Sequence, residues 1–409
     1  MELAMSSDIC TINALSKTIE HINGFDALES FQTQIAKAIQ YGRVAFLTGA
    51  GISVARSTFG PNWQDMMQNL LAEIAAITKG KKYPHSYDGK YFKPRMKMFF
   101  NEHVLQLIHE HLDVDAAVQV VTEALPQNHS CIHRFLVLCS ILYDCPILTT
   151  NFDGLERSAF DEGLKQGAFG NLDDKNNPET IFKKTFFLHG ERDKPETIKI
   201  RTKQVLAPLS PKDKTRLQNL LRDKVLIVLG YNGQDDFDVM PYLFEDENNY
   251  PEAIIWIVHN GSHNREAGPP LNMPEHRNHP KLHSLHIGDT DLLLQGIYKR
   301  IVEEGKKITK DTEKWLPKEW KDKCSEDDKD YWKKKISSWG QELRDKKPLE
   351  MLELWGAILK KNTVIRCRWT ELCHTNPGDD TKCLCKSRCS KKTHGGVKDY
   401  RDSPCFKNG

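Results

Sequence analysis

The chain of 409 residues is 39% hydrophobic and 28% charged, a composition typical of globular proteins and unlike that of disordered or fibrous chains. Its formal net charge is only +2, so charge gives no reason to expect direct nucleic-acid binding, and we expect nucleic acid to be reached only indirectly, through a partner. The first residues lack a basic start with an apolar core, and no later run is long enough for a membrane span, so we expect a cytoplasmic protein without membrane contact.

The first strand is predicted over residues 43–48, where the apolar run RVAFLT enters the turn Gly49–Ser53. Glycines after a strand suit phosphate binding, because they let the backbone approach a pyrophosphate and the following helix presents its amides. The third glycine of a dehydrogenase turn is absent near Val54. A turn whose glycines serve packing alone is the alternative.

A helical insertion is predicted over about residues 63–140. Apolar residues recur there at three- and four-residue spacing, first between Trp63 and Ile77, as on one face of an amphipathic helix. Near its end His129, Cys131 and His133 alternate, which would suggest a metal site. Helical spacing points such side chains apart, so we expect no metal there.

Four further apolar runs predict strands at residues 146–150, 185–188, 225–229 and 253–258. Strands that are apolar throughout are expected where helices cover both faces of a parallel sheet. Ligands bind at the carboxyl ends of such strands. The segments that follow the five runs are Gly49–Ser53, Asn151–Asp153, His189, Gly230–Asp236 and His259–Asn260.

Beyond residue 300 the chain becomes rich in lysine and tryptophan, and we place a domain boundary near Gly305. Residues 301–409 contain 26 Lys and Arg against 19 Asp and Glu. Short helices with one apolar and one charged face are predicted, too small for an independent core. We expect residues Trp315–Ile358 to dock on a second copy or on a partner protein through aromatic anchors. Packing on the chain's own preceding domain is the alternative.

The eleven cysteines fall into two groups. Five are scattered, and in a chain without secretory features we expect them to be reduced and mostly buried. The other six lie between Cys367 and Cys405 but lack paired C-x-x-C spacing. A zinc site and a disordered basic tail are both open interpretations of that segment.

Taken together, the strand-end motifs resemble those of the sirtuin (Sir2-type) family. Gly49–Ser53, Thr150–Asp153, Leu188–Gly190 and Gly230–Asn232 occur in sirtuin order. The resemblance implies an α/β fold with a Rossmann-like parallel sheet of sirtuin type, a helical insertion and a helical carboxyl-terminal region. We predict an N-terminal extension over 1–29, a sirtuin-like NAD-binding catalytic domain over 30–300 and, from composition, a helical, basic, cysteine-containing region over 301–409.

The resemblance also implies that NAD binds and that each motif has a role in binding it. Asn151 and Asp153 are implied to line the nicotinamide and ribose pocket, and His189 to be the catalytic histidine. The glycine turn is implied to hold the pyrophosphate, and the later motifs to contact the adenosine half. The implied cofactor-binding residues are Thr48, Gly49, Ala50, Gly51, Ser53, Gly230, Tyr231, Asn232, His259, Asn260 and Asp289.

Two departures separate the chain from the protein deacylases of that family. The Pro-Asp-Phe-Arg element that follows their glycine turn is missing, since Ser53 is followed by VARSTFGPNW. No cysteine lies between Cys145 and Cys324, which excludes their four-cysteine zinc site, and we expect no metal in the first 300 residues. Instead GYNGQDDFD at Gly230–Asp238 resembles divergent bacterial sirtuin-like proteins of antiviral defence, most of which degrade NAD.

The chemistry of these residues agrees with NAD cleavage. Breaking the bond between nicotinamide and ribose builds positive charge on the ribose, so the site must orient cofactor and water and accept a proton. Asn151 can position the ribose or a water, Asp153 can stabilise charge or orient the amide, and His189 can act as base. We predict an NAD+ hydrolase (NADase) that acts as an antiviral, abortive-infection effector. A zinc-free NAD-dependent deacylase and a non-catalytic subunit that senses NAD or ADP-ribose are the alternatives.

The resemblance also bears on assembly. Similar proteins pair with a hexameric DNA-translocating ATPase of the HerA type, with short Argonaute proteins, or with no partner. We therefore expect a homo-oligomer, with a HerA-type ATPase as a candidate partner defence protein.

Overall fold

The computed structural model describes only part of the chain, including most of the predicted sheet and its helices. The predicted N-terminal extension up to residue 24 and the cysteine-rich tail after residue 358 lie outside the described residues. None of the helices that are described is long and apolar enough to cross a membrane. The described residues are 25–54, 58, 60–61, 63–77, 101–112, 115–170, 184–200, 209–233, 239–244, 251–259, 279, 281–287, 289–304, 307–320 and 331–358.

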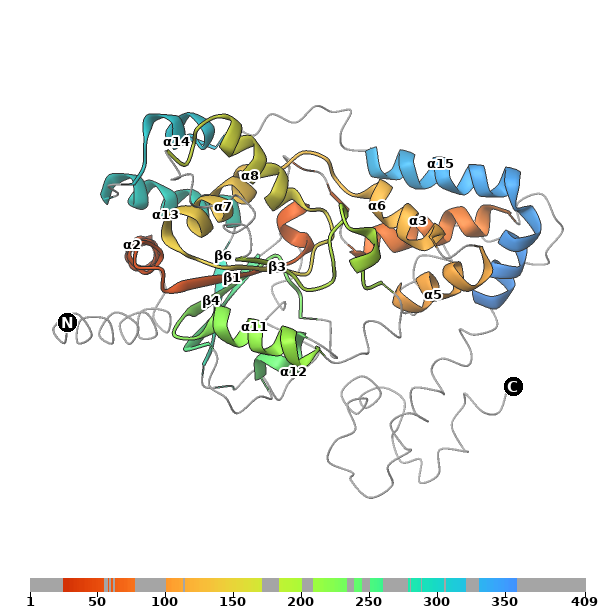
Figure 1. Cartoon of the computed structure of the whole chain (residues 1–409), viewed down its shortest axis with the longest axis horizontal. Helices are drawn as coiled ribbons and strands as arrows, with labels where there is room; N and C mark the ends of the chain where they lie inside the picture. The colour runs from red at the N-terminus through yellow and green to blue at the C-terminus, as the bar shows by residue number, and fades with distance from the viewer. Residues whose placement is uncertain are drawn as a thin grey trace, which may run out of the picture.

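A six-stranded sheet forms the centre of the molecule (Figure 1), with the strand order β3-β2-β1-β4-β5-β6. Every strand pair is parallel. The order reverses between β1 and β4, as in doubly wound dinucleotide-binding sheets, so the predicted Rossmann-like α/β fold is confirmed. The strands are β1 (Val44–Thr48), β2 (Ile147–Thr149), β3 (Thr185–Phe187), β4 (Val225–Leu229), β5 (Ala253–His259) and β6 (Leu282–Ile287).

Five of these strands coincide with the predicted apolar runs, whereas the sequence pattern misses β6. Its sequence LHSLHI mixes His and Ser with Leu and Ile, so it is not the uninterrupted apolar run that identifies the other strands. β6 is an edge strand with β5 as its one neighbour in the sheet. β3, at the other edge, is largely apolar and is predicted, so the mixed sequence of β6 and not its edge position alone accounts for the difference.

Helices cover both faces of the sheet because alternate residues of each strand point to opposite faces. In β1, Val44 and Phe46 join a hydrophobic cluster with one group of helices, and Ala45 and Leu47 join a cluster with another. Figure 1 shows the first group above the sheet and the second below it. The first group is α2 (Phe25–Gln40), α7 (Cys131–Tyr143), α8 (Leu155–Lys165) and α13 (Thr290–Glu304); the second is α11 (Pro211–Leu221) and α12 (Val239–Phe244).

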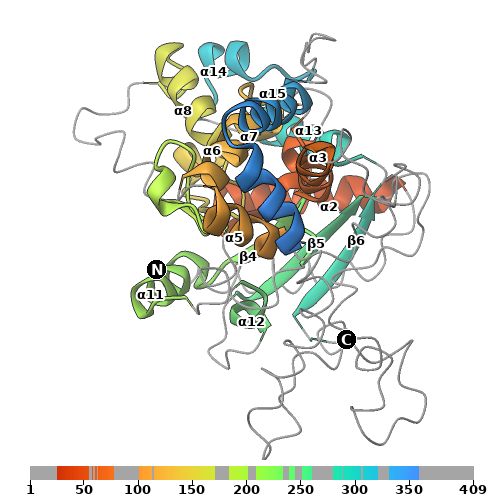
Figure 2. The same ribbon diagram turned by 90° about the vertical axis from the view of Figure 1, so that its right-hand side faces the viewer.

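A third group of helices forms what we call the helical lobe, to one side of the sheet (Figures 1 and 2). The lobe has its own hydrophobic cluster, in which α15 packs on α3 and α6. The residues described within the predicted insertion are largely helical, but α7 at its end belongs to the cluster of the sheet. The lobe consists of α3 (Trp63–Ala76), α5 (Asn101–His111), α6 (Ala116–Ala124), α15 (Tyr331–Lys346) and the helical residues 348–358.

The segment after residue 300 divides between these clusters. Residues 307–320, with α14 (Lys310–Trp315), pack on the sheet side, where Trp315 and Leu316 are buried. The Tyr298 hydroxyl donates a hydrogen bond to the Leu316 carbonyl at 2.6 Å. The domain boundary near Gly305 stays a prediction, but the chain just beyond it contributes to the core of the sheet.

The rest of the described carboxyl-terminal region belongs to the helical lobe. Trp332, Trp339 and Trp355 are 7%, 4% and 2% exposed and lie in the lobe's cluster. The expectation that these tryptophans anchor a partner is therefore wrong, and the alternative of packing on the same chain is correct for them. An amphipathic pattern shows which helix face is buried but not what covers it. Homo-oligomerisation itself stays a prediction.

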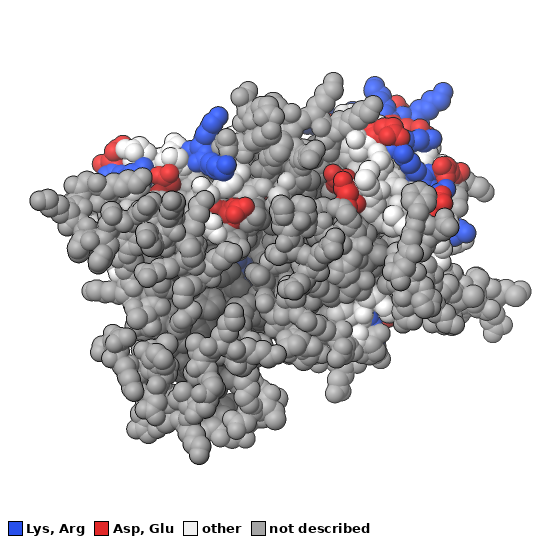
Figure 3. Space-filling view, turned by 180° about the vertical axis from the view of Figure 1, so that it is seen from behind, with Lys and Arg blue, Asp and Glu red and all other residues white. Residues whose placement is uncertain are grey.

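The described surface seen from behind carries charges of both signs (Figure 3). Ion pairs join some of the described charged side chains, such as Lys299 with Glu319 and Arg300 with Glu303. On the face that Figure 3 draws, the described Lys and Arg side chains lie among Asp and Glu side chains.

Candidate functional site

The turn after β1 lies directly against the turn after β4. The Gly49 and Gly51 amides donate to the Leu229 and Gly230 carbonyls at 3.0 and 2.8 Å. A β-carbon on Gly49 would lie 2.7 Å from Tyr231 Cα, and one on Gly51 would lie 2.6 Å from Gly230 Cα, so only glycine fits. Packing alone therefore explains both glycines. A pyrophosphate held here would need amides other than these two.

This contact lies where the strand order reverses, between β1 and β4. In open parallel sheets the chains leaving two such strands diverge, and the crevice between them is where nucleotides bind. Residues 50–53, which form the 3-10 helix η1 (Ala50–Ser53), lie at this point. The position suits the predicted dinucleotide site independently of the individual glycines.

Three predicted site residues meet at the ends of β1 and β2. The Ser53 hydroxyl donates to Asp153 Oδ2 at 2.7 Å. The side-chain nitrogen Nδ2 of Asn151 lies 3.2 Å from the Gly49 carbonyl oxygen and 3.4 Å from Ser53 Oγ, and it donates to both. Ser53, Asn151 and Asp153 are 2%, 6% and 3% exposed. The parallel pairing of β1 with β2 brings these distant parts of the sequence into one buried polar cluster.

His133 in α7 completes this polar cluster, and the sequence analysis does not assign it to the site. Its Nδ1 accepts a hydrogen bond from the Ser130 backbone amide at 3.2 Å, so Nε2 carries the proton, and Nε2 lies 3.4 Å from Ser53 Oγ. Complete burial and the nearby His129 lower the pKa of His133 to about 3, which leaves the ring neutral. His133 Nε2 therefore donates to Ser53 Oγ, and the Ser53 hydroxyl donates to Asp153 Oδ2.

The one sequence signal that points to His133 is its place three residues after Ser130. A serine before a helix and a polar residue three positions later form a capping pair, which directs the second side chain back towards the helix start. The spacing alone does not show that the start of α7 lies beside the glycine turn, which is a consequence of the tertiary fold.

Asp153 is fully engaged within the protein. Besides accepting from Ser53, it accepts the Leu155 amide at 3.1 Å through Oδ1, which stabilises the start of α8. Burial raises the pKa of Asp153, and the Ser53 hydroxyl, the Leu155 amide and the charge of Arg192 oppose that rise. With both oxygens in use, Asp153 is placed to orient its neighbours rather than to touch a ligand.

His189 follows β3 and lies beside the turn that carries Asn151 and Asp153. Its ring centroid is 6.2 Å from that of Phe152, whose ring is 5.6 Å from that of Trp63 in α3. The Lys199 amide donates to the His189 carbonyl at 2.7 Å, just beyond the 3-10 helix η3 (Pro195–Thr197). Phe152 thus links the predicted catalytic histidine to the helical lobe, whose cluster it joins.

The remaining predicted cofactor contacts differ in their surroundings. The Thr48 side chain is fully buried, and Tyr231 packs its ring 5.7 Å from that of Trp256. Asn232 is exposed, and Asp289 accepts the Asp291 amide at 2.8 Å at the start of α13. The His259 side chain and Asn260 lie outside what the structure describes. These assignments stay predictions, although Thr48 and Tyr231 face the protein interior.

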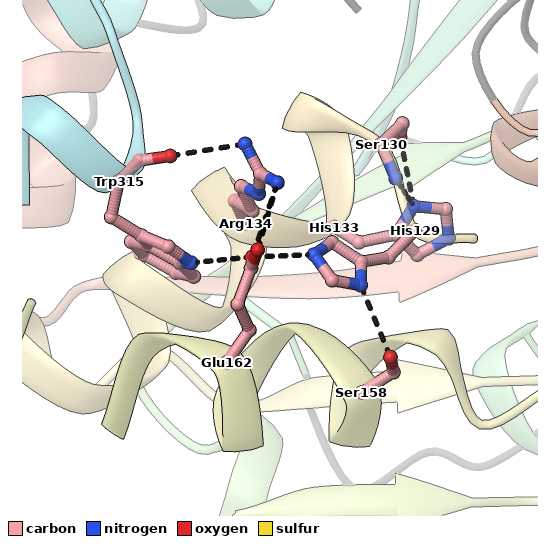
Figure 4. Close-up of polar contacts among 7 residues, drawn as sticks. All are labelled: His129, Ser130, His133, Arg134, Ser158, Glu162 and Trp315. Atoms are coloured by element: carbon pink, nitrogen blue, oxygen red, sulfur yellow. Dashed lines mark hydrogen bonds and ion pairs between the residues drawn. The ribbon is translucent and has the colours of Figure 1, made fainter. Parts of the chain in front are cut away.

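The alternating residues near position 130 point in different directions (Figure 4). His129 turns away from His133, with Nδ1 3.1 Å from Ser158 Oγ and Nε2 2.8 Å from Glu162 Oε2. Arg134 and Trp315 also donate to Glu162. Among the described side chains, no group of three or more His, Cys, Asp or Glu is placed to hold a metal.

Comparison with known families identifies part of this region. Residues 146–279 match the family described as the SIR2-like domain. The match spans β2 to β5 and includes Asn151, Asp153, His189 and the Gly230 turn, but not the glycine turn after β1. No curated protein matches the chain. The match supports a Sir2-type family, which is a family of NAD-dependent enzymes.

Proposed function

We propose that this protein hydrolyses NAD+ at the nicotinamide–ribose bond and releases nicotinamide and ADP-ribose. The observation that carries this proposal is the buried cluster of Ser53, Asn151 and Asp153 at the carboxyl ends of β1 and β2. The cluster lies next to the point where sheets of this order bind dinucleotides. Buried polar groups destabilise a fold unless they are hydrogen-bonded. A network assembled from two strand ends and α7 is explained by a reaction that needs oriented polar groups.

In the proposed reaction the bond between ribose C1′ and the nicotinamide nitrogen breaks. Its electron pair goes to the nicotinamide, which leaves as a neutral molecule, and positive charge develops on the ribose. Water then forms a bond to C1′ and gives up a proton, which His189 accepts as base. Asn151 holds the ribose or the water, and Asp153 acts through Ser53 to keep the Asn151 amide in place.

Water is the proposed acceptor because the features that serve an acyl-lysine substrate are missing from the sequence. The segment after Ser53 lacks the deacylase element, and no cysteine lies between Cys145 and Cys324 to form the deacylase zinc site. A zinc-free deacylase and a non-catalytic sensing subunit remain the competing functions, and one assay separates all three.

The assay incubates the full chain with NAD+, with and without an acyl-lysine peptide, and measures nicotinamide and ADP-ribose by chromatography. We expect nicotinamide release from NAD+ alone, unchanged by the peptide. His189→Ala should abolish release while NAD+ binding and the unfolding temperature stay close to those of the wild type, since a proton acceptor is lost without disturbing the core. His111→Ala, in α5, is the matched control and should behave as the wild type.

Each other outcome identifies an alternative. Release that requires the peptide, with transfer of the acyl group to ADP-ribose, would indicate a deacylase. NAD+ binding without turnover would indicate a sensing subunit. Near-normal turnover by His189→Ala would show that the active site is assigned incorrectly.

We also propose that the activity serves antiviral defence, on the basis of the likeness of residues 230–238 to sirtuin-like defence proteins. Cells expressing the wild-type chain should lose NAD+ after phage infection and form fewer plaques, whereas cells expressing His189→Ala should not. Co-purification with a HerA-type ATPase encoded nearby would support the partner proposal. Constant NAD+ in infected cells would contradict the defence role while leaving the hydrolysis assay unaffected.

A further inference from the structure

Glu156, in the first turn of α8, is a buried carboxyl group that the proposed mechanism does not use. It is 0% exposed. Its Oε1 lies 3.5 Å from the Thr48 hydroxyl, and its Oε2 has no hydrogen-bond partner within the described part of the chain. An ionised carboxylate with one oxygen unpaired is far more costly to bury than a neutral acid.

The contact with Thr48 also favours a neutral acid. The Thr48 hydroxyl lies 3.4 Å from the Leu148 carbonyl, which can only accept a hydrogen bond. A hydroxyl has one proton, so when Thr48 donates to Leu148 the contact with Glu156 requires a proton on the carboxyl group. A protonated Glu156 satisfies both contacts of Thr48 at once.

Asp153 lies close enough to Glu156 for the two charges to interact. Glu156 is surrounded in a way that favours a neutral acid, whereas the surroundings of Asp153 favour an ionised carboxylate. Asp153 accepts hydrogen bonds from the Ser53 hydroxyl and the Leu155 amide and lies near the positive Arg192. Glu156 has the long Thr48 contact and its own backbone amide, and the charges that act on it, those of Asp153 and Glu191, are negative. When two buried carboxyl groups interact, one proton is retained, and it stays on the group whose ionised form the surroundings stabilise less.

We infer that Glu156 is a positioning residue that retains the proton of a buried Asp153–Glu156 pair, so that Asp153 stays ionised and holds Ser53 and Asn151 in place. The place of the proton follows from the burial, hydrogen bonds and charges around the two carboxyl groups. Its importance for the reaction rests on the proposed function.

The charged groups around Glu156 agree with this arrangement. Two negative charges interact with Glu156: that of Asp153, in the turn after β2, and that of Glu191, in the segment after β3. Arg157 Nε lies 2.9 Å from Glu191 Oε1, and the charge of Arg192 acts on Asp153, so these two cations are engaged with other acids. Burial, followed by the negative charge of Asp153, raises the pKa of Glu156 to about 8. The first turn of a helix favours an anion, but burial outweighs that effect here.

At high pH we expect the hydrogen bonds that connect Asp153, Ser53 and Asn151 to be disrupted. If Glu156 ionises, two negative charges lie together in the interior, and either Asp153 takes up the proton or the turn shifts. Ser53 then loses the anion to which it donates, and Asn151 loses a fixed acceptor in Ser53 Oγ. Glu156 would thereby affect the Asn151 amide without touching the ligand.

The first test measures stability and does not depend on enzymatic activity. Between the ordinary pKa of 4.5 and about 8 the folded chain holds one more proton than the unfolded chain, so the stability of the wild type falls as pH rises through this window. Glu156→Gln, a neutral group of the same shape, removes this dependence. The unfolding temperature of Glu156→Gln minus that of the wild type should increase from pH 5 to pH 8 and then level off.

Asp161→Asn, on the exposed side of α8, is the matched control, because it makes the same chemical change where no buried pair is involved. Its unfolding temperature should follow that of the wild type at a constant offset. A constant offset for Glu156→Gln as well would overturn the inference, since it would place the proton elsewhere.

The second test measures nicotinamide release across the same pH range. Glu156→Gln should keep turnover within about threefold of the wild type at pH 7 and exceed it above pH 8, whereas Glu156→Ala should lose more than about tenfold at pH 7. A folded Glu156→Gln variant without turnover would show that Glu156 must be ionised, against the inference. If the wild type releases no nicotinamide at all, the proposed function fails, and the stability comparison still locates the proton.

Discussion

The polar cluster at the strand ends and the helical lobe beside it differ in the kind of side chain that each buries. Ser53, His133, Asn151 and Asp153 are buried polar side chains held by hydrogen bonds from three separate elements. The lobe is an apolar cluster formed by helices from two distant parts of the sequence. Hydrogen bonds exchange with bonds to water on unfolding and add little net stability, whereas apolar burial is the main source of it. We therefore attribute the polar cluster to the proposed function and the apolar lobe to the stability of the fold.

The two regions share one residue. Phe152 lies between Asn151 and Asp153 in sequence, and its side chain, 9% exposed, joins the cluster of the lobe. Its ring neighbours are His189 and Trp63. The lobe is thus placed to support the proposed catalytic histidine, and variants in each region should separate activity from stability.

Among the variants that compare the two regions, Asn151→Ala should give the largest effect on activity. The variant loses the donor to Ser53 Oγ and to Gly49, and we expect nicotinamide release to fall at least about 10²–10³-fold, as when one preorganised donor is removed from an active site. The Gly49 carbonyl keeps its bond from the Ile52 amide, so the free energy of unfolding should change by only about 1 kcal/mol. Kinetic assays and denaturant unfolding measure both quantities.

Gln127→Ala is the control for that experiment, because it removes an exposed amide near the start of α7. It should change neither turnover nor stability. Turnover by Asn151→Ala close to that of the wild type would remove Asn151 from the site.

Trp339→Ala should have the opposite profile. Trp339 is 4% exposed in the lobe, and its truncation should lower the free energy of unfolding by about 3–5 kcal/mol, the usual cost of removing a buried aromatic side chain. Elution from a sizing column should stay unchanged, because the side chain is covered by its own chain. Leu349→Ala, a change at a side chain that is 68% exposed, should stay within about 0.5 kcal/mol of the wild type. Unchanged stability with altered elution would restore a partner interface at Trp339.

The contrast between the regions also explains what the sequence could predict. The central strands are recognisable because both of their faces are covered, so their residues are apolar throughout, as in VAFLT and VLIVL. The strand LHSLHI lacks that property and is missed. The pattern after residue 330 identifies apolar helix faces but not what covers them, because α3, on which α15 packs, lies more than 250 residues earlier and no local pattern encodes that pairing.

The site follows the same division. Asn151, Asp153 and Ser53 are predictable because each lies in the segment that follows a strand, and the ends of parallel strands meet at one edge of the sheet. His133 and Glu156 lie within helices, where a polar residue is ordinarily exposed, and only the packing of α7 and α8 against the glycine turn and β1 buries them. Their involvement depends on tertiary contacts that spacing alone does not reveal.

Phe152→Leu tests the link between the regions with an intermediate effect. Leucine keeps most of the apolar contact but loses the ring that neighbours His189, so we expect kcat for nicotinamide release to fall roughly tenfold, about the size of one aromatic pair interaction, with KM little changed. Phe169→Leu is the control, since its ring stacks on Phe160 at 5.9 Å in the cluster of the sheet. It should lower stability without changing kcat. A rise in KM with constant kcat for Phe152→Leu would instead indicate direct contact with the ligand.

Glu162→Gln should give the smallest effect, because it weakens a partly exposed network that attaches residues 307–320 to α7 and α8. Partial burial raises the pKa of Glu162. The hydrogen bond from His129 and the charge of Arg134 lower this pKa by more, so it lies below the ordinary value. Its stabilising contribution is therefore present above the ordinary glutamate pKa and is lost as pH falls through the folded-state value. Because the side chain is 32% exposed, we expect a difference from the wild type of about 1 kcal/mol or less at pH 7 that closes below pH 4. Glu342→Gln, in an exposed pair with Lys346 on α15, should differ less at pH 7. If the difference in unfolding free energy between the wild type and Glu162→Gln is equally large at both pH values, the shape of the side chain and not its charge holds residues 307–320 in place.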